Sequence, residues 1–206
     1  MKYQLKPLTI HEHVDYVDAV RRFYLGSSQY YFFCDVETTG NKPLTHEIIA
    51  MAWILTDRNL NLIEKDYQLF MPTHEKWSKE AESVHGISRE KLQEFGVDKK
   101  EYLVNLLLTL NQCTFISHAQ KTGEGYFDFN MLMYDCLKLD IVRRFDSVFN
   151  GLNQISTIAY ARQAKLGVLN HKLSTLAEFF NIDLDHHDAQ SDVNACFEIF
   201  KKLEAM

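Results

Sequence analysis

The chain has 206 residues, of which 46% are hydrophobic, and it contains only 8 glycines and 3 prolines. This composition excludes a disordered, collagen-like or linker-dominated protein, and the length is that of one domain rather than two. With 22 Lys and Arg against 28 Asp and Glu, the net charge of −6 excludes a protein that coats nucleic acid through a general basic surplus. Any contact with nucleic acid therefore has to be local or assisted by metal ions.

Three features of the sequence bear on its compartment. Residues 1–18 have no apolar core of signal-peptide length and no small-residue cleavage site. The longest uncharged stretch, residues 102–120, contains too many polar side chains to span a membrane. The cysteines are scattered, with no close pair typical of a zinc or redox site: Cys34, Cys113, Cys136 and Cys196. We therefore expect a cytoplasmic protein with reduced, buried thiols and no membrane association.

The first 28 residues predict a helical extension. Thr9 and Glu12 have the spacing of a capping box, and valines follow at helical spacing. After a polar break, the aromatic run from Tyr30 to Cys34 predicts a central buried strand. We found no internal repeat or linker beyond it, so residues 29–206 are expected to form one domain.

After this strand the sequence predicts two more strands, a helix, another strand and then helices. Glu47–Thr56 and Leu60–Phe70 predict two more strands of an antiparallel meander, joined by a tight turn. Asp98 with Glu101 predicts the cap of a helix, and Cys113–Ser117 predicts a short buried strand. Further helices are predicted over Tyr126–Leu139, Asn153–Gln163, Leu173–Phe180 and Ala189–Leu203. Together they indicate a mixed α/β fold.

The end of the first strand carries two acidic residues. Asp35 and Glu37 are two residues apart, so alternation along a strand points both carboxylates to the same face. Two neighbouring carboxylates repel each other and are costly to desolvate, and a divalent cation is the usual compensation; a solvated strand edge is the alternative. Thr38-Thr39-Gly40 follows, where hydroxyls and a permissive glycine can receive a polar ligand. This segment favours a binding site.

Further candidates for the same site come later in the chain. Asp128 opens a predicted helix, where an acid is also favoured by the helix N-terminus alone. Asp188 is a candidate N-cap of the last helix, which places Asp192 in the opening turn and His187 just before it. A histidine beside metal-binding acids can take a proton from water because its pKa lies near neutral pH, whereas a surface histidine is the alternative.

At these residues the sequence resembles a known family. The segments DVETTG, YFDFN and HDAQSD match, in order, the three motifs of the DnaQ-like, DEDDh-type 3′→5′ exonucleases. The matched residues are Asp35, Glu37, Asp128, His187 and Asp192. Residues 84–88, VHGIS, match the segment between the first two motifs, and the resemblance covers residues 30–203. The sequence is similar to polymerase III epsilon-subunit-like and RNase T-like exonucleases. This resemblance implies a ribonuclease H-like fold with a mixed sheet flanked by helices.

The resemblance implies a role for each matched residue. Two Mg²⁺ or Mn²⁺ ions would be bound by Asp35, Glu37, Asp128 and Asp192, with His187 as general base. The 3′-terminal nucleotide would be contacted by Thr38, Thr39, Val84, His85 and His118. The implied activity is metal-dependent hydrolysis of phosphodiester bonds at the 3′ end of single-stranded or frayed DNA or RNA, which releases nucleoside 5′-monophosphates.

Two departures from the family pattern stand near the second and third motifs. Relatives have an Asn directly after the histidine that corresponds to His118, whereas here a longer loop, residues 119–125, follows and suggests a mobile flap with Lys121. Ile155 stands where many relatives have an acid. A basic stretch near the third motif either guides the strand or is a solvated face: Arg162, Lys165, His171 and Lys172.

Alternatives to a free-standing DNase stay open at the level of sequence. The chain could be a proofreading-type subunit that acts mainly as an interaction module, docking on a polymerase through the helix with Val14, Val17 and Val20. It could also be an exoribonuclease that processes RNA 3′ ends, because discrimination rests on how a pocket treats the 2′-hydroxyl. The VHGIS segment favours a proofreading or DNA repair role. A binding domain without catalysis is disfavoured because no acid is missing.

Overall fold

The structure, a computed structural model, describes residues 28–122, 125–141, 152–185 and 188–206. All but the last residue of the predicted N-terminal extension, 1–28, therefore lies outside the described residues. Among the described helices, none is long and apolar enough to cross a membrane. All four cysteines are free and buried, which confirms the prediction for them.

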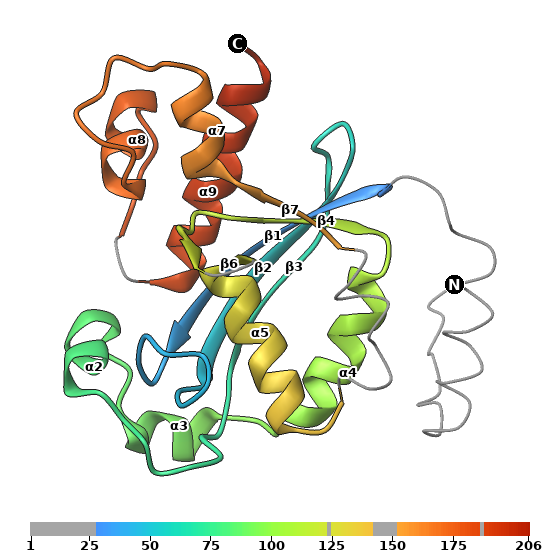
Figure 1. The fold of residues 1–206 in the computed structure, drawn as a ribbon, viewed down its shortest axis with the longest axis vertical. Helices are drawn as coiled ribbons and strands as arrows, with labels where there is room; N and C mark the ends of the chain where they lie inside the picture. Colours follow the sequence, from blue (N-terminus) through green and yellow to red (C-terminus); the bar gives the residue numbers. More distant parts are fainter. Residues whose placement is uncertain (1–27, 123–124, 142–151, 186–187) are drawn as a thin grey trace.

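A five-stranded mixed sheet forms the centre of the molecule, in the order β3-β2-β1-β4-β7 (Figure 1). Its strands are β1 (Tyr30–Thr38), β2 (Ile48–Asp57), β3 (Leu62–Leu69), β4 (Cys113–Ser117) and β7 (Asn153–Ser156). The pairs β1–β2 and β2–β3 are antiparallel, whereas β1–β4 and β4–β7 are parallel. The predicted antiparallel meander and the α/β class are both confirmed.

Helices cover both faces of this sheet (Figure 1). One face packs against α4 (Lys99–Leu110) and α5 (Phe127–Lys138), and the other against α9 (Ala189–Glu204). Two more helices, α7 (Thr157–Gln163) and α8 (Leu173–Phe180), pack on α9. The short helices α2 (Lys79–His85) and α3 (Arg89–Phe95) lie beyond the end of β1 at which the arrow points.

Alternation along β1 decides which helix layer each side chain meets. Phe32 and Cys34 belong to the core cluster under α4 and α5, whereas Tyr31 and Phe33 belong to the cluster under α9. Because side chains alternate along a strand, Asp35 continues the series that faces α9. The strand that forms the core thus also sets the direction of the acids at its end.

One predicted helix is partly wrong. Residues Asn153–Gln163 were expected to be helical throughout, but the first four form β7, which pairs in parallel with β4 from Thr114↔Asn153 to Ser117↔Ser156. The helix begins only at Thr157, where the Ser156 side chain accepts a hydrogen bond from the Ala159 N–H. The open edge of β4 offers backbone hydrogen bonds that outweigh the local helical pattern.

Gly96 ends α3 in a place with no room for a side chain. A Cβ atom there would lie 2.7 Å from the Met71 nitrogen and 2.9 Å from the Phe70 carbonyl carbon, and against the Leu92 oxygen. These are backbone atoms that cannot yield cheaply, so we expect Gly96→Ala to lower the free energy of unfolding by about 2–4 kcal/mol. Gly167→Ala, where a Cβ meets nothing within 4 Å, is the matched control, and urea denaturation of both variants checks the difference.

Candidate active site

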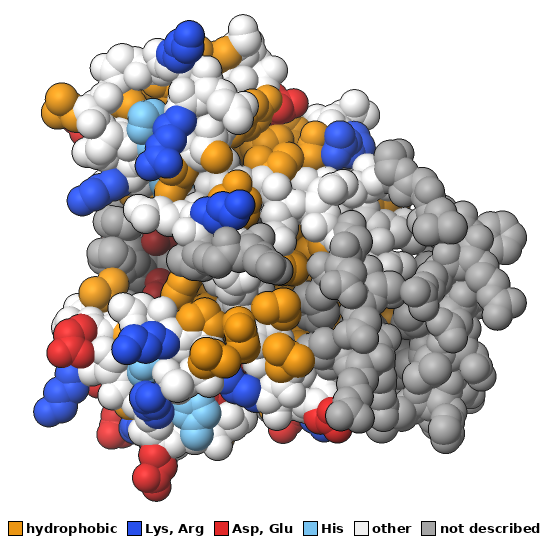
Figure 2. Space-filling model, in the orientation of Figure 1, with side chains coloured by type: hydrophobic (Ala, Val, Ile, Leu, Met, Phe, Trp, Pro, Cys, Tyr) orange, Lys and Arg blue, Asp and Glu red, His pale blue; other side chains and the backbone are white. Residues whose placement is uncertain are grey.

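Three carboxylates from two elements meet at the end of β1. Asp35 and Glu37 come from β1 and Asp192 from the first turn of α9, and one oxygen of each lies within 4.8 Å of the others. Figure 2 shows acidic side chains inside a recess between the part of the molecule that holds α7, α8 and α9 and the part that holds α2 and α3. The structure thus brings together three of the four acids that the sequence predicts.

Asp128, the fourth acid, lies in the first turn of α5. It is only 5% exposed, and the neighbouring Ser117 side chain and Val36 backbone act to lower its pKa. Burial is the larger effect and raises the pKa of Asp128 to about 6. Its charge acts on the cluster, because it is among the groups that raise the pKa of Asp35 and of Glu37.

The electrostatics of the cluster are unfavourable without a cation. Burial and then repulsion by Asp128, Glu37 and Asp192 raise the pKa of Asp35 well above its usual value. The pKa of Glu37 is raised to about 8, first by burial and then by Asp192 and Asp128. Oxygen ligands of this kind, closely spaced and partly desolvated, suit hard divalent cations such as Mg²⁺ and Mn²⁺. The donor set therefore fits a metal site.

The start of α9 is held by the residue that the sequence indicates. Asp188 is the N-cap, and its side chain accepts a hydrogen bond from the Ser191 N–H at 3.0 Å. This cap fixes the turn that carries Asp192 and places it near the positive end of the helix dipole. The predicted general base, His187, lies outside the described residues.

The two threonines after the acids are turned into the protein. Thr38 is 8% exposed and its hydroxyl donates to the Gly40 carbonyl at 2.9 Å. Thr39 is fully buried, and its hydroxyl oxygen accepts from the Glu47 N–H at 3.1 Å and shares a hydrogen bond with His46 Nδ1 at 3.3 Å. In this structure the hydroxyl of Thr39 therefore stabilises the loop that leads into β2.

The predicted nucleotide-contacting pair Val84 and His85 stands at the end of α2. Val84 is 49% exposed, whereas His85 is half-buried and its Nδ1 accepts from the Ile87 N–H at 3.0 Å. Gly86 ends the helix with φ 65°, a left-handed conformation that favours glycine, and its N–H donates to the Glu82 carbonyl. This short helix end presents an apolar side chain to the surface.

Both ring nitrogens of His118 have partners within the protein. Nδ1 lies 2.7 Å from Thr157 Oγ1, and Nε2 lies 3.0 Å from the His171 carbonyl oxygen. A carbonyl only accepts, so Nε2 donates, and the ring joins the end of β4 to the basic loop before α8. Of the predicted basic residues in this region, Arg162, Lys165 and Lys172 are exposed.

The loop that the sequence predicts as a flap contains a small hairpin. Lys121–Thr122 (β5) pairs with Gly125–Tyr126 (β6), and the Tyr126 N–H donates to Gln154 Oε1 at 3.2 Å. The exposed Lys121 lies on this hairpin. Lys and Arg side chains stand on both sides of the recess in Figure 2, together with Asp and Glu on the side of α2 and α3, so cations lie near the acids although the chain as a whole is acidic.

Sequence reasoning missed a second group of charges behind the acids. Glu47, Lys99 and Asp135 are each at most 2% exposed, and Lys99 forms an ion pair with each of the two carboxylates. Nothing in the local sequence marks them, because the Lys99–Glu47 and Lys99–Asp135 pairs join residues 52 and 36 positions apart.

Comparisons with known proteins agree with this arrangement. A family model described as Exonuclease, RNase_T, matches residues 32–200. A segment of the PolC-type DNA polymerase III of Caldanaerobacter subterraneus subsp. tengcongensis is 26% identical over 170 residues, which is 82% of this chain but only 11% of that protein. The chain thus spans about a tenth of the length of this curated relative.

Solved structures of exonuclease I have the same fold. A product-bound exonuclease I superposes with a TM-score of 0.72 at 16% identity, over 87% of this chain and 44% of the other. The exonuclease I of Methylocaldum szegediense gives 0.71 at 20% identity, over 85% and 40%. The E. coli enzyme in complex with a dT13 oligonucleotide gives 0.71 at 17% identity, over 85% and 41%.

These likenesses establish the fold and the family together. The five-stranded mixed sheet with helices on both faces is the ribonuclease H-like fold of exonuclease I, as the sequence predicts. The family model spans most of the chain and includes all three acids of the cluster. The chain belongs to the DnaQ-like 3′–5′ exonuclease family.

Proposed function

We propose that this protein is a metal-dependent exonuclease that hydrolyses the phosphodiester bond at the 3′ end of single-stranded or frayed nucleic acid and releases nucleoside 5′-monophosphates. The observation that supports this most directly is the cluster of Asp35, Glu37 and Asp192 in a recess bordered by cationic side chains. Family membership gives the nuclease class, and the site would supply the chemistry.

The carboxylates would hold the metal. Asp35, Glu37 and Asp192 would bind one divalent cation, and Asp128, whose charge acts most strongly on Asp35, would complete the set for a second. Mg²⁺ or Mn²⁺ bound there would lower the charge on the scissile phosphate and make a water molecule more acidic. Binding of the polyanion would then depend on metal, which accounts for nuclease activity in a protein of net charge −6.

The chain's own residues would place the substrate and move the proton. His187 would take a proton from the attacking water, and the resulting hydroxide would bond to phosphorus. The bond from phosphorus to the 3′ oxygen of the penultimate nucleotide would break, and that oxygen would take a proton from solvent to become the new 3′-hydroxyl. Thr38, Val84 and His85 would line the terminal nucleotide. Because the polar groups of Thr39 are engaged within its loop, we propose that Thr39 shapes this subsite rather than bonding to substrate through its hydroxyl.

His118 would contribute to the upstream part of the strand. Its ring holds the His171 carbonyl, so it would keep the exposed Lys172 and its neighbours facing the path of the substrate. One of the similar solved structures is a zinc-bound complex of E. coli exonuclease I with single-stranded DNA, which supports a single-stranded substrate here. DNA and RNA would be distinguished by the 2′-hydroxyl at the terminal nucleotide.

The test is cleavage of 5′-labelled single-stranded DNA and RNA of matched sequence, each with Mg²⁺, with Mn²⁺ and with EDTA. With either metal we expect a ladder of products that shorten from the 3′ end, and with EDTA we expect intact substrate. The nucleic acid that is cleaved faster, DNA or RNA, is the preferred substrate. Internal cuts, or equal cleavage in EDTA, would contradict the proposal. The monophosphate product should also be detected by chromatography.

A second candidate function follows from the polymerase relative. Because the chain matches a segment of a PolC-type polymerase, we propose that it also acts beside a polymerase, with residues 1–28 as the docking segment. Deletion of residues 1–28 should remove co-purifying partners while the isolated domain keeps its activity. The docking role loses its basis if the truncated and full-length chains recover the same partners.

A further inference from the structure

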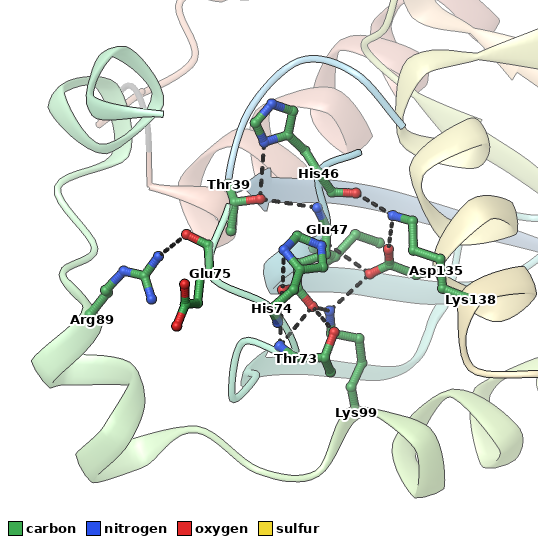
Figure 3. Close-up of polar contacts among 11 residues, drawn as sticks. Thr39, His46, Glu47, Thr73, His74, Glu75, Arg89, Lys99, Asp135 and Lys138 are labelled. Atoms are coloured by element: carbon green, nitrogen blue, oxygen red, sulfur yellow. Dashed lines mark hydrogen bonds and ion pairs between the residues drawn. The ribbon is translucent and has the colours of Figure 1, made fainter. Parts of the chain in front are cut away.

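Lys99 lies at the centre of a buried charge network beneath the recess. Its ammonium is 2.7 Å from Glu47 Oε2 and 2.9 Å from Asp135 Oδ2, and all three side chains are 1% exposed (Figure 3). Burial alone would raise the pKa of Glu47, but Lys99 and the hydrogen bonds from Thr73 outweigh it and lower the pKa. Lys138, 3.0 Å from Asp135 Oδ1, adds a second cation, so two cations balance two carboxylates.

Each carboxylate of the network also holds backbone from a different segment. Glu47 accepts from the Thr73 N–H at 2.9 Å and the His74 N–H at 3.2 Å, and from the Thr73 hydroxyl at 2.8 Å. Asp135 accepts from the Ile48 N–H at 2.9 Å, at the start of β2. The network thus joins β2, α4, α5 and the segment between β3 and α2 at one point.

The proposed nucleotide subsite has two walls, the Thr38–Thr39 loop and the end of α2, and the network is connected to both. On one side, the Glu47 N–H donates to the Thr39 hydroxyl, and Lys138 donates to the His46 carbonyl of the same loop. On the other side, the Ser78 N–H donates to the Thr39 carbonyl at 2.8 Å. Ser78 is the N-cap of α2, whose last residues are Val84 and His85. Both walls are therefore tied to each other through Thr39 and to Lys99 through Glu47.

We propose that Lys99 is a positioning residue: through Glu47 and Asp135 it fixes the distance between the Thr38–Thr39 loop and the end of α2, and so sets the subsite for the 3′-terminal nucleotide. The inference rests on the proposed function for its substrate and on the structure for the network. The three clustered acids come from β1 and α9, and none of them is an ion-pair partner of Lys99. Asp128 shares α5 with Asp135 but lies in the first turn of that helix, about two turns away from Asp135. Metal binding and the hydrolytic chemistry are therefore separable from what Lys99 does.

If Lys99 only positions the nucleotide, its loss should slow cleavage of an oligonucleotide but not hydrolysis of a phosphodiester that has no nucleoside. In Lys99→Met the buried Glu47 loses Lys99 and Asp135 keeps only Lys138, so the loop and α2 shift relative to each other. A displacement of about 1 Å can cost about 100-fold in rate. We expect kcat/KM for an oligonucleotide to fall by about 100-fold, mainly through KM. Hydrolysis of bis(p-nitrophenyl) phosphate, which has no nucleoside to be positioned, should stay within about threefold of wild type.

Because Lys99→Met alone could unfold, a second variant that also removes the charges of both buried carboxylates is needed. Glu47→Gln/Lys99→Met/Asp135→Asn keeps side-chain volume and leaves no uncompensated carboxylate, and such replacements are often neutral for stability. Two controls match it: Lys201→Met removes an exposed ion pair with Glu198, and Leu203→Ala weakens the core under α8. We expect the triple variant to fold and its kcat/KM for the oligonucleotide to be lower than that of wild type by about tenfold or more. Both controls should keep the wild-type ratio of oligonucleotide cleavage to bis(p-nitrophenyl) phosphate hydrolysis.

A measurement that does not use activity separates this proposal from the proposed function. Hydrogen exchange of the triple variant should speed up at residues 73–78 and 39–48 and stay unchanged in β4 and α9. Wild-type oligonucleotide kcat/KM in the folded triple variant would overturn the positioning role. A wild-type protein that cleaves neither substrate would instead overturn the nuclease, while unchanged exchange at 73–78 in the triple variant would overturn the network's hold on these segments.

Discussion

Asp35→Asn is expected to lower exonuclease activity by more than about 1,000-fold and, in the same protein, to raise the stability of the metal-free fold. The side chain would bind metal in the working enzyme, so its loss removes a ligand that the reaction needs. Without metal, the half-buried Asp35 carboxylate faces Asp128, Glu37 and Asp192, and desolvation together with this repulsion raises its pKa. Asparagine keeps the shape and removes the charge.

Two measurements test both halves of this expectation. Oligonucleotide cleavage in Mn²⁺ gives the loss of activity, and thermal unfolding in EDTA should show a midpoint at least about 3 °C above wild type. Asp183→Asn, an exposed acid in the segment before α9, is the control and should change neither quantity. Full activity of Asp35→Asn would remove the residue from the site, and a lower midpoint in EDTA would show that repulsion in the cluster is not what the variant relieves.

Elements with local signals in the sequence are found in the structure nearly as predicted. The strand Cys113–Ser117 and the helix Leu173–Phe180 have the predicted bounds. Asp98 caps α4 through the Lys100 and Glu101 N–H groups, as expected of its position. In each case a few neighbouring residues contain the whole signal, either a hydrophobic period or a capping side chain, so no knowledge of the tertiary structure is needed.

Elements that depend on distant partners could not be predicted. Residues Asn153–Ser156 form a strand only because the edge of β4 is open to them. The helices α2 and α3 have seven residues each and bury at most one side chain, Leu92 in α3, so they have no periodic pattern to detect. They form because serine caps and their contacts with the rest of the fold stabilise them.

The same distinction applies to the site. Asp35 and Glu37 share a short motif whose chemistry is visible in sequence, and their closeness to Asp192 follows from the family resemblance. Lys99, in contrast, stands beside Lys100 with no local difference, yet one is buried at 2% exposure and the other is exposed. Only the packing of α4 against β2 and α5 separates the two, because burial of a lysine requires carboxylates from other elements.

Glu37 should make the stability of the metal-free protein fall with rising pH. Its pKa is raised from 4.5 to about 8, so between these values the folded protein retains a proton that the unfolded chain has released. Linkage then gives a loss of stability as pH rises through this range, about 2 kcal/mol between pH 6.5 and 8. The pKa of His46 is lowered by burial and by Lys76, so its contribution to stability rises with pH instead of falling. That contribution is complete near pH 6.5, the usual pKa of histidine, so it does not offset the loss from Glu37 at higher pH.

Metal should cancel this loss, because a divalent cation favours the ionised carboxylates and displaces the proton from Glu37. Urea denaturation at pH 6.5 and 8 in EDTA should therefore show the protein less stable at pH 8, and excess Mn²⁺ should stabilise it more at pH 8 than at pH 6.5. The stability of Glu37→Gln should fall less than that of wild type over this interval in EDTA. Asp35, whose pKa is also raised, stays in both proteins, so the difference between them reports the Glu37 carboxyl group. Calorimetry in buffers of different ionisation enthalpy should record proton release on Mn²⁺ binding at pH 7 that disappears above pH 9. If the wild-type protein were equally stable at both pH values in EDTA, Glu37 would already be ionised in the empty site, and the cluster would need another source of compensation for its charge.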